Sequence, residues 1–226
     1  FTVWDYAIDQ GFAYGSGMGT NHHYGYQIRK IYTTAWLMRK AILKSSRRDD
    51  ILKTLLFWSA LQETRRPCAE IRDEMLDSWN TLLQPKLISA MMIPDECARV
   101  QALYGLSRWV SGSVNCTPGT IGGIKVDGTT FHHGGFYPAY TTGALATVSD
   151  YIAMTGGTEF VPSLEARRLL ASAFTAMRNY SNLIEWSTGL GGRHPFSGKM
   201  GGADIKAFAQ LAPVSYTHLT LPTTSR

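Results

Sequence analysis

Apolar residues recur at helical spacing along most of the chain, and this periodicity limits the possible folds more than any other feature of the sequence. Two successive amphipathic helices are indicated by apolar positions at Ile28, Ile31, Ala35, Met38 and Ile42 and then at Ile51, Leu55 and Trp58. Further helices are expected around residues 71–85, 96–110, 142–154, 163–177 and 204–212. No segment alternates convincingly between apolar and polar residues. We therefore expect an all-α fold of stacked helical hairpins, with an α/α toroid as the first choice.

Prolines mark several of the expected helix boundaries. Pro94-Asp95-Glu96 and Pro162-Ser163 are typical of helix starts, because a proline or a capping side chain suits the first turn. The helix of residues 71–85 is expected to end near Pro85, where a backbone N–H is missing, with the alternative that it resumes or kinks through residues 87–92.

Two glycine-rich segments interrupt the helical pattern. The first runs from Ser111 to Tyr140 and the second from Gly189 to Gly202. Long loops are uncommon in a compact helical domain unless they carry a function. We therefore expect both loops at one end of the helical array, with the functional residues in them.

The composition is that of an ordinary globular protein, with 44% hydrophobic and 17% charged residues. The formal net charge of +5 permits a polyanionic partner, such as an acidic polysaccharide. A nucleic-acid partner is disfavoured because the basic residues are dispersed, and the pair Arg47-Arg48 is followed at once by Asp49-Asp50. No apolar stretch approaches the roughly 18 residues of a membrane span, so no membrane partner is expected. The oligomeric state is left open.

Neither a cofactor nor a metal site is expected. Cys68, Cys97 and Cys116 lack zinc-ligand spacing and are interpreted as isolated thiols. The histidines show no HExxH motif and no His/carboxylate spacing.

Residues 214–226 do not continue the pattern of the rest of the chain. They resemble translated sequencing-adapter read-through, so we treat residues 1–213 as one domain and the remainder as an unrelated tail. Such a tail is expected to pack against nothing, because it was never selected to complement the core.

Histidines and tyrosines gather in the first glycine-rich loop. The nine residues from His132 to Tyr140 include His133 and Tyr137 as well, and glycines between them let backbone approach a ligand closely. Imidazole and phenol groups are both usable for proton transfer. On an extended loop, adjacent side chains point to opposite sides, so only one of His132 and His133 is expected to face a substrate.

Two further segments have a similar character. His22, His23 and Tyr26 are expected in a loop just before the first long helix. Arg193 and His194 lie in the second glycine-rich loop, where a guanidinium group is suited to bind a carboxylate or sulfate with two hydrogen bonds.

Together these motifs resemble those of the chondroitin ABC lyases in polysaccharide lyase family eight. The run from His133 to Tyr140 is similar to the active-site signature of that family. Residues 127–129 are similar to the residues that come just before that signature in the family. Residues 192–196 resemble the family's downstream arginine motif, and residues 22–29 its upstream histidine motif. The order and spacing of the three blocks agree as well. Two positions depart from the family pattern: Gly134 replaces an acidic residue and His132 replaces an arginine, which can alter substrate preference.

The resemblance implies β-elimination at C4 of a uronic acid in chondroitin or dermatan sulfate, with hyaluronan as a further candidate. His22, and after it His23, would neutralise the uronate carboxylate. Tyr140 would protonate the leaving oxygen and also take the C5 proton of glucuronate. His133 would be the base for iduronate. Arg193 would favour the phenolate of Tyr140, whose unperturbed pKa of about 10 is too high for a base.

The resemblance also implies contacts from substrate to Arg29, His132, Tyr137 and His194. It further implies that the chain is an incomplete toroid. The family's β-sandwich, which carries another catalytic glutamate, would come later, so the chain alone is expected to be inactive. A secreted or periplasmic location is expected on the same basis.

Two alternatives remain open. An α/α-toroid glycoside hydrolase would need two carboxylic acids beside the scissile bond, and neither glycine-rich loop contains such a pair. A non-catalytic glycan-binding fragment would use the same aromatic and basic groups for affinity alone. Formation of an unsaturated uronate distinguishes elimination from both.

Overall fold

The computed structural model describes residues 1–215 except 71–74, 183, 193 and 197. Its helices are α1 (Thr2–Asp9), α2 (Asn21–Leu37), α3 (Arg39–Lys44), α4 (Arg48–Trp58), α5 (Met75–Asp77), α6 (Leu83–Met91), α7 (Glu96–Ser113), α8 (Pro138–Thr155), α9 (Leu164–Asn179) and α10 (Gly202–Ser215). A π-helical turn, Ser78–Leu82, joins α5 to α6. The expectation of a mainly helical fold is confirmed. In the described part of the chain, no helix is long and apolar enough to cross a membrane.

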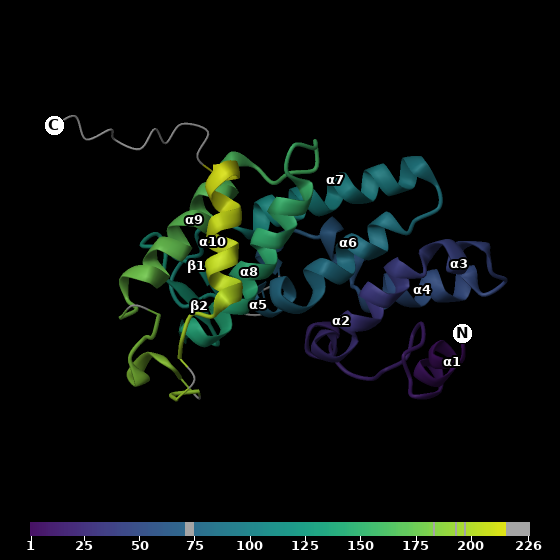
Figure 1. The fold of residues 1–226 in the computed structure, drawn as a ribbon, viewed down its shortest axis with the longest axis horizontal. Helices are drawn as coiled ribbons and strands as arrows, with labels where there is room; N and C mark the ends of the chain where they lie inside the picture. The colour runs from purple at the N-terminus through teal and green to yellow at the C-terminus, as the bar shows by residue number, and fades with distance from the viewer. Residues whose placement is uncertain (71–74, 183, 193, 197, 216–226) are drawn as a thin grey trace.

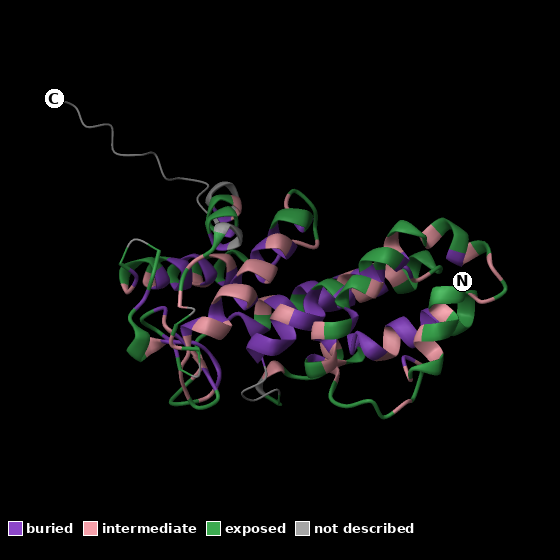
Figure 2. Ribbon diagram, turned by 60° about the horizontal axis from the view of Figure 1, so that its bottom comes forward, coloured by how far each residue is buried: buried purple, intermediate pink, exposed green. Residues whose placement is uncertain are grey.

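The helices pack around two main groups of buried residues. One group lies at the α1 to α4 end of the molecule and includes Phe12, Tyr32 and Trp58. The other lies at the α8 to α10 end and includes Trp79 and Leu145. Helix α6 lies between the two ends (Figure 1). Buried residues follow the inward faces of the helices, as amphipathic helices require (Figure 2).

The expected helix starts at Asp95 and Ser163 are confirmed. The carboxylate of Asp95 accepts a hydrogen bond from the backbone N–H of Ala98 at 2.7 Å, and the hydroxyl of Ser163 accepts one from Ala166 at 3.2 Å. Each cap satisfies an N–H that has no partner within its own helix. Helix α8 begins earlier than expected, with Pro138 in its first turn.

The expected helix end near Pro85 is wrong, but helical structure does run through residues 87–91, as the alternative of a resumed or kinked helix predicted. Helical structure continues from Met75 through the π-helical turn and α6 to Met91, with Pro85 in the first turn of α6. A first-turn proline needs no N–H, and the preceding π-helical turn changes the hydrogen-bond register there. The helix can therefore continue past the proline. The part of this prediction that concerned Ile71 lies outside the described residues.

The first glycine-rich segment is more ordered than expected, because it forms a small antiparallel sheet of β1 (Gly123–Ile124), β2 (Thr130–His132) and β3 (Gly135–Phe136). Strand β2 pairs with both neighbours, and His132 is opposite Gly135. Strands of two or three residues are too short to show an alternating pattern, which is why the sequence indicated only a loop.

The expected loop at residues 22–26 is also wrong, since these residues form the first turns of α2. The side-chain amide of Asn21 donates hydrogen bonds to the carbonyls of Phe57, at 2.9 Å, and Trp58, at 3.4 Å. These bonds fix the start of α2 to the end of α4. The histidines of this motif therefore lie on a helix and not on a flexible loop.

Gly25 lies where α2 meets the π-helical turn. A Cβ atom at this position would lie 2.7 Å from both Cβ and Oγ1 of Thr81, which is fully buried and donates a hydrogen bond to the carbonyl of His22. We expect Gly25→Ala to lower the free energy of unfolding by about 1–3 kcal/mol, because the crowded side chain cannot move away. Urea unfolding measures this change.

Gly105 provides the matched control within helix α7. A Cβ atom there would come no closer than 3.7 Å to Thr64, which is ordinary contact. Gly105→Ala should keep or raise stability, since alanine favours helix over glycine by about 1 kcal/mol. Equal effects of the two variants would show that α2 does not pack this closely.

Almost all of the proposed tail lies outside the described residues. Helix α10 continues through Ser215, so it includes the first two residues of the tail. The division of the chain at residue 213 stays a prediction.

Candidate active site

Two histidines and two tyrosines of the first glycine-rich segment form one cluster of rings, which we call the ring cluster: His132, His133, Tyr137 and Tyr140. Ring centroids are 3.9 Å apart for His132 and His133, 4.5 Å for His132 and Tyr140, and 5.6 Å for His133 and Tyr140. The two tyrosine rings stack at 4.9 Å. His132 is buried, His133 is exposed and both tyrosines are partly buried. The ring cluster thus reaches from the core to the surface.

The backbone explains why these side chains meet. His133 and Gly134 both have positive φ, at 51° and 78°, as a two-residue hairpin turn between β2 and β3 requires. The expectation that His132 and His133 point to opposite sides is wrong, because the chain turns at His133 instead of staying extended. Tyr140 then joins the cluster from the first turn of α8.

Asp77, at the end of α5, connects this cluster to the upstream histidine motif. Its carboxylate is almost fully buried, with Oδ2 3.5 Å from Nε2 of His132. Its other oxygen, Oδ1, accepts a hydrogen bond from the hydroxyl of Tyr26 at 2.8 Å. His22 and His23 complete the group, because one ligand atom from each lies within 4.8 Å of the others and of an Asp77 oxygen.

The electrostatics of Asp77 follow from these neighbours. Burial acts to raise the pKa of Asp77, but the contacts with His132 and Tyr26 and the nearby charges of His132 and His22 outweigh it and lower the pKa. Asp77 is therefore ionised at neutral pH. Burial, followed by the hydrogen bond to Asp77 and the charge of that carboxylate, raises the pKa of Tyr26 to about 12, so Tyr26 acts as a donor.

His22, His23 and Asp77 are residue types that can bind a metal ion, and only folding brings them together. Both oxygens of Asp77 already have neighbours, in Tyr26 and His132. We therefore interpret the group as a polar network. His22 is buried, and its ring centroid lies 4.2 Å from that of the exposed His23. Nδ1 of His23 lies 2.9 Å from the hydroxyl of Thr20.

The second glycine-rich loop meets the ring cluster at Gly192. A Cβ atom there would overlap the ring of Tyr137, so only glycine allows this contact. Arg193, the next residue, lies outside the described residues. His194 is exposed and donates its backbone N–H to the carbonyl of Gly191 at 2.9 Å. The two glycine-rich segments are therefore neighbours in space.

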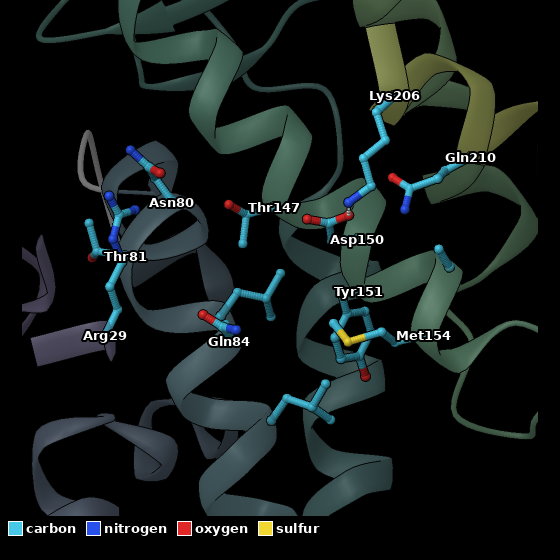
Figure 3. Close-up of a pocket in the computed structure, with 13 residues that line it drawn as sticks. Arg29, Asn80, Thr81, Gln84, Thr147, Asp150, Tyr151, Met154, Lys206 and Gln210 are labelled. Carbon is cyan, nitrogen blue, oxygen red and sulfur yellow. Dashed lines mark hydrogen bonds and ion pairs between the residues drawn. The ribbon is translucent and has the colours of Figure 1, made fainter. Parts of the chain in front are cut away.

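Arg29 lies apart from the ring cluster, beside the ring of Tyr26. Its guanidinium carbon is 6.0 Å from the Tyr26 ring centroid. It lines a pocket of about 440 Å³ whose other polar groups include Asn80, Lys206 and Gln210 (Figure 3). Arg29 and Asn80 lie on one side of this pocket and Lys206 and Gln210 on the other. Asn80 donates a hydrogen bond to the hydroxyl of Tyr26 at 3.4 Å, which links the pocket to the Asp77 network.

The sequence analysis missed Asp77 and Asn80. Asp77 is buried between Leu76 and Ser78, and its one signal in the sequence was a carboxylate directly after the apolar pair Met75-Leu76. A charged side chain is seldom fully buried without a partner. That signal identifies a paired residue, but it does not identify the partner.

Comparisons with known proteins identify the family of the chain. A family model described as "Lyase, catalytic" matches residues 1–217. The chain is 34% identical over 193 residues to the chondroitin sulfate ABC exolyase of Bacteroides thetaiotaomicron, covering 85% of this chain and 19% of that protein. It is 31% identical over 190 residues to the exolyase of Proteus vulgaris, covering 84% and 19%, and 30% identical over 205 residues to the endolyase of that organism, covering 90% and 20%.

The chain spans about a fifth of the length of these curated relatives. The match of the family model extends over nearly all of the chain and includes every residue of the ring cluster. The resemblance inferred from the motifs is confirmed, and the chain belongs to the family of lyase catalytic domains.

Proposed function

We propose that the protein containing this chain is a glycosaminoglycan lyase that cleaves uronate-containing chains, chondroitin and dermatan sulfate first, by β-elimination. The observation that carries the proposal is the juxtaposition of His133 and Tyr140, whose ring centroids are 5.6 Å apart beside the Asp77 network. Such a pair could carry out the two proton transfers, and the nearby His22 and His23 could neutralise a carboxylate. The names of the three relatives, all chondroitin sulfate ABC lyases, support the same substrate class.

The proposed reaction needs a base, an acid and a carboxylate neutraliser around one sugar ring. A base removes the C5 proton, the electron pair of that bond forms the C4–C5 double bond, and the C4–O bond breaks as its oxygen takes up a proton. For glucuronate, Tyr140 would fill both proton-transfer roles. For iduronate, whose C5 hydrogen lies on the other face, His133 would be the base. His22 and His23 would donate hydrogen bonds to the uronate carboxylate.

Arg193 would place a positive charge near Tyr140 and so favour its phenolate. Support for this role comes from the neighbouring residue, because Gly192 packs directly on the ring of Tyr137, which stacks on Tyr140. Tyr137 and His194 are proposed to contact substrate. His132 was expected to do so as well, but it is 1% exposed, so we propose that it acts from behind His133 and Tyr140.

A glycoside hydrolase is less well supported. Hydrolysis would need two carboxyl groups about 5–9.5 Å apart beside the bond. Among the described residues of the ring cluster and its network, the carboxylate is Asp77, which is 3% exposed and so cannot act on a polysaccharide directly. A purely binding role would leave the paired His133 and Tyr140 without a chemical purpose.

Ultraviolet absorbance of the unsaturated uronate tests the proposal. The protein that carries this chain should generate this absorbance from chondroitin sulfate. New reducing ends without absorbance would indicate hydrolysis, and neither signal would indicate binding alone.

We further infer that the described helices form part of an incomplete α/α toroid. By the same resemblance, a later β-sandwich would supply another catalytic glutamate, so we expect the chain alone to be inactive. An acidic polysaccharide as partner and a secreted or periplasmic location belong to the same proposal.

Arg29 is expected to bind substrate without taking part in the chemistry. Arg29→Ala should raise KM about three- to tenfold and leave kcat unchanged, because the guanidinium would hold a remote anionic group equally in the ground and transition states. Steady-state kinetics on chondroitin sulfate measure both constants. Arg48→Ala is the control, since Arg48 lies at the start of α4 and pairs with Asp49. An unchanged KM in the Arg29 variant would show that Arg29 does not bind substrate.

A further inference from the structure

We propose that Asp77 is a positioning residue of the candidate active site. Its buried carboxylate orients the imidazole of His132, and through His132 it orients the ring of Tyr140. The expected effect on kcat rests on the proposed function. The expected effect on the orientation of His132 does not, and it can be measured independently. Asp77 lies more than 50 residues before His132 in the sequence, and neither the family match nor the relatives' names assign it a role.

The position of Asp77 is fixed by its own helix and by α2. Thr81 is the key contact, because its buried hydroxyl donates to the carbonyl of Asp77 and to that of His22, each at 2.8 Å. Tyr26, from the second turn of α2, holds Oδ1 of the carboxylate at 2.8 Å. With Oδ1 held by Tyr26, Oδ2 is directed to His132.

His132 depends on Asp77 for its orientation. It is 1% exposed, and among the described residues neither of its ring nitrogens has a hydrogen-bond partner. Oδ2 of Asp77 lies 3.5 Å from its Nε2. Catalytic hydrogen bonds are often long before substrate binds and shorten in the complex. A carboxylate in this place favours a proton on Nε2 and leaves Nδ1 as an acceptor.

The orientation of His132 matters because the rings of both proposed proton-transfer groups, His133 and Tyr140, pack against its ring. Its ring centroid lies 3.9 Å from that of His133 and 4.5 Å from that of Tyr140. These are closer contacts than the 5.6 Å between His133 and Tyr140 themselves. A rotation of the His132 ring would therefore displace both groups, and displacements of about 1 Å can cost two orders of magnitude in rate.

The groups that face Asp77 come from three elements. Helix α2 supplies His22, His23 and Tyr26, strand β2 supplies His132, and the π-helical turn supplies the hydroxyl of Thr81 to the backbone carbonyl. A buried carboxylate with so many donors around it also contributes to folding. The experiment must therefore separate positioning from stability.

Asp77→Asn makes this separation, because asparagine keeps the size of the side chain and can still accept a hydrogen bond from Tyr26. Its amide group can also donate to Nε2, so it no longer favours a proton there. In nitrogen-15 NMR of the protein that carries this chain, we expect the proton of His132 on Nε2 in the original protein and a shift towards Nδ1 in the variant. In the lyase assay, we expect kcat to fall about 10–100-fold with KM nearly unchanged, the range typical when a functional histidine loses its carboxylate partner.

Asp49→Asn is the matched control, since Asp49 is an exposed carboxylate paired with Arg48 on α4. It should change neither the His132 signal nor kcat. An Asp77→Asn variant that folds and keeps both the Nε2 proton and normal kcat would overturn the inference. A changed His132 signal in a protein that yields no unsaturated product would contradict the proposed function and leave the Asp77–His132 pair supported.

Tyr26→Phe provides a second test of the inference if the Asp77→Asn variant does not fold. It keeps the ring but removes the hydroxyl that holds Oδ1 of Asp77. We expect a smaller loss of kcat, about three- to tenfold, with a changed His132 signal and a modest loss of thermal stability, because Oδ1 of the buried carboxylate loses its donor. Unchanged kinetics and an unchanged signal in this variant would show that Asp77 does not position His132.

Discussion

Tyr140→Phe should reduce turnover of glucuronate-containing chondroitin sulfate by about 10²–10⁴-fold, with little change in KM. The substitution keeps the ring that stacks on Tyr137 at 4.9 Å and lies 4.5 Å from His132, and it removes only the ionisable hydroxyl. Loss of activity would then be due to the missing proton-transfer group and not to altered packing. Initial rates of unsaturated uronate formation in the protein that carries this chain measure the effect.

Tyr104→Phe is the control for this measurement. Tyr104 is 41% exposed on α7 and packs against Phe160, away from the ring cluster. It should retain full activity. Near-normal turnover by the Tyr140 variant would place the proton transfer on another residue.

His133→Asn should separate the two uronic acids. We expect activity on iduronate-containing dermatan sulfate to fall about 10²–10⁴-fold, because asparagine cannot act as a base. Activity on glucuronate should change only a few-fold, since Tyr140 would remain in place. Asparagine is chosen because His133 has a φ of 51° and asparagine before Gly134 is favoured in such a hairpin turn.

The ratio of the two activities provides an internal control. A folding defect would lower both rates equally, whereas the loss of a base specific for iduronate changes their ratio. Equal losses on both substrates, in a variant of normal thermal stability, would contradict the role assigned to His133.

Local features of the fold were predictable from the sequence. Asp95 and Ser163 were expected to begin helices, and the structure shows both as caps. The motif from His132 to Tyr140 could be identified because its members are close in sequence. Each of these predictions depends on interactions between residues only a few positions apart.

Features that depend on distant contacts were not predictable in the same way. Asn21 begins α2 by donating hydrogen bonds to carbonyls at the end of α4, more than 30 residues away, and no local pattern around residues 22–26 indicates that contact. Asp77 meets His132 only after α5 and β2 have packed together. The turn at His133 requires positive φ, which is uncommon for residues other than glycine, so the sequence favours an extended chain there.

Mass spectrometry of the products tests the central claim most directly. Elimination breaks the C4–O bond without using water, so the masses of the two products should sum to that of the substrate oligosaccharide, and one product should carry the C4–C5 double bond. Hydrolysis would add one water across the cleaved bond, so its two products together would be heavier than the substrate by one water. Products of chondroitin sulfate whose masses sum to that of the substrate plus one water would contradict the assignment of this chain's active site to a β-eliminating lyase.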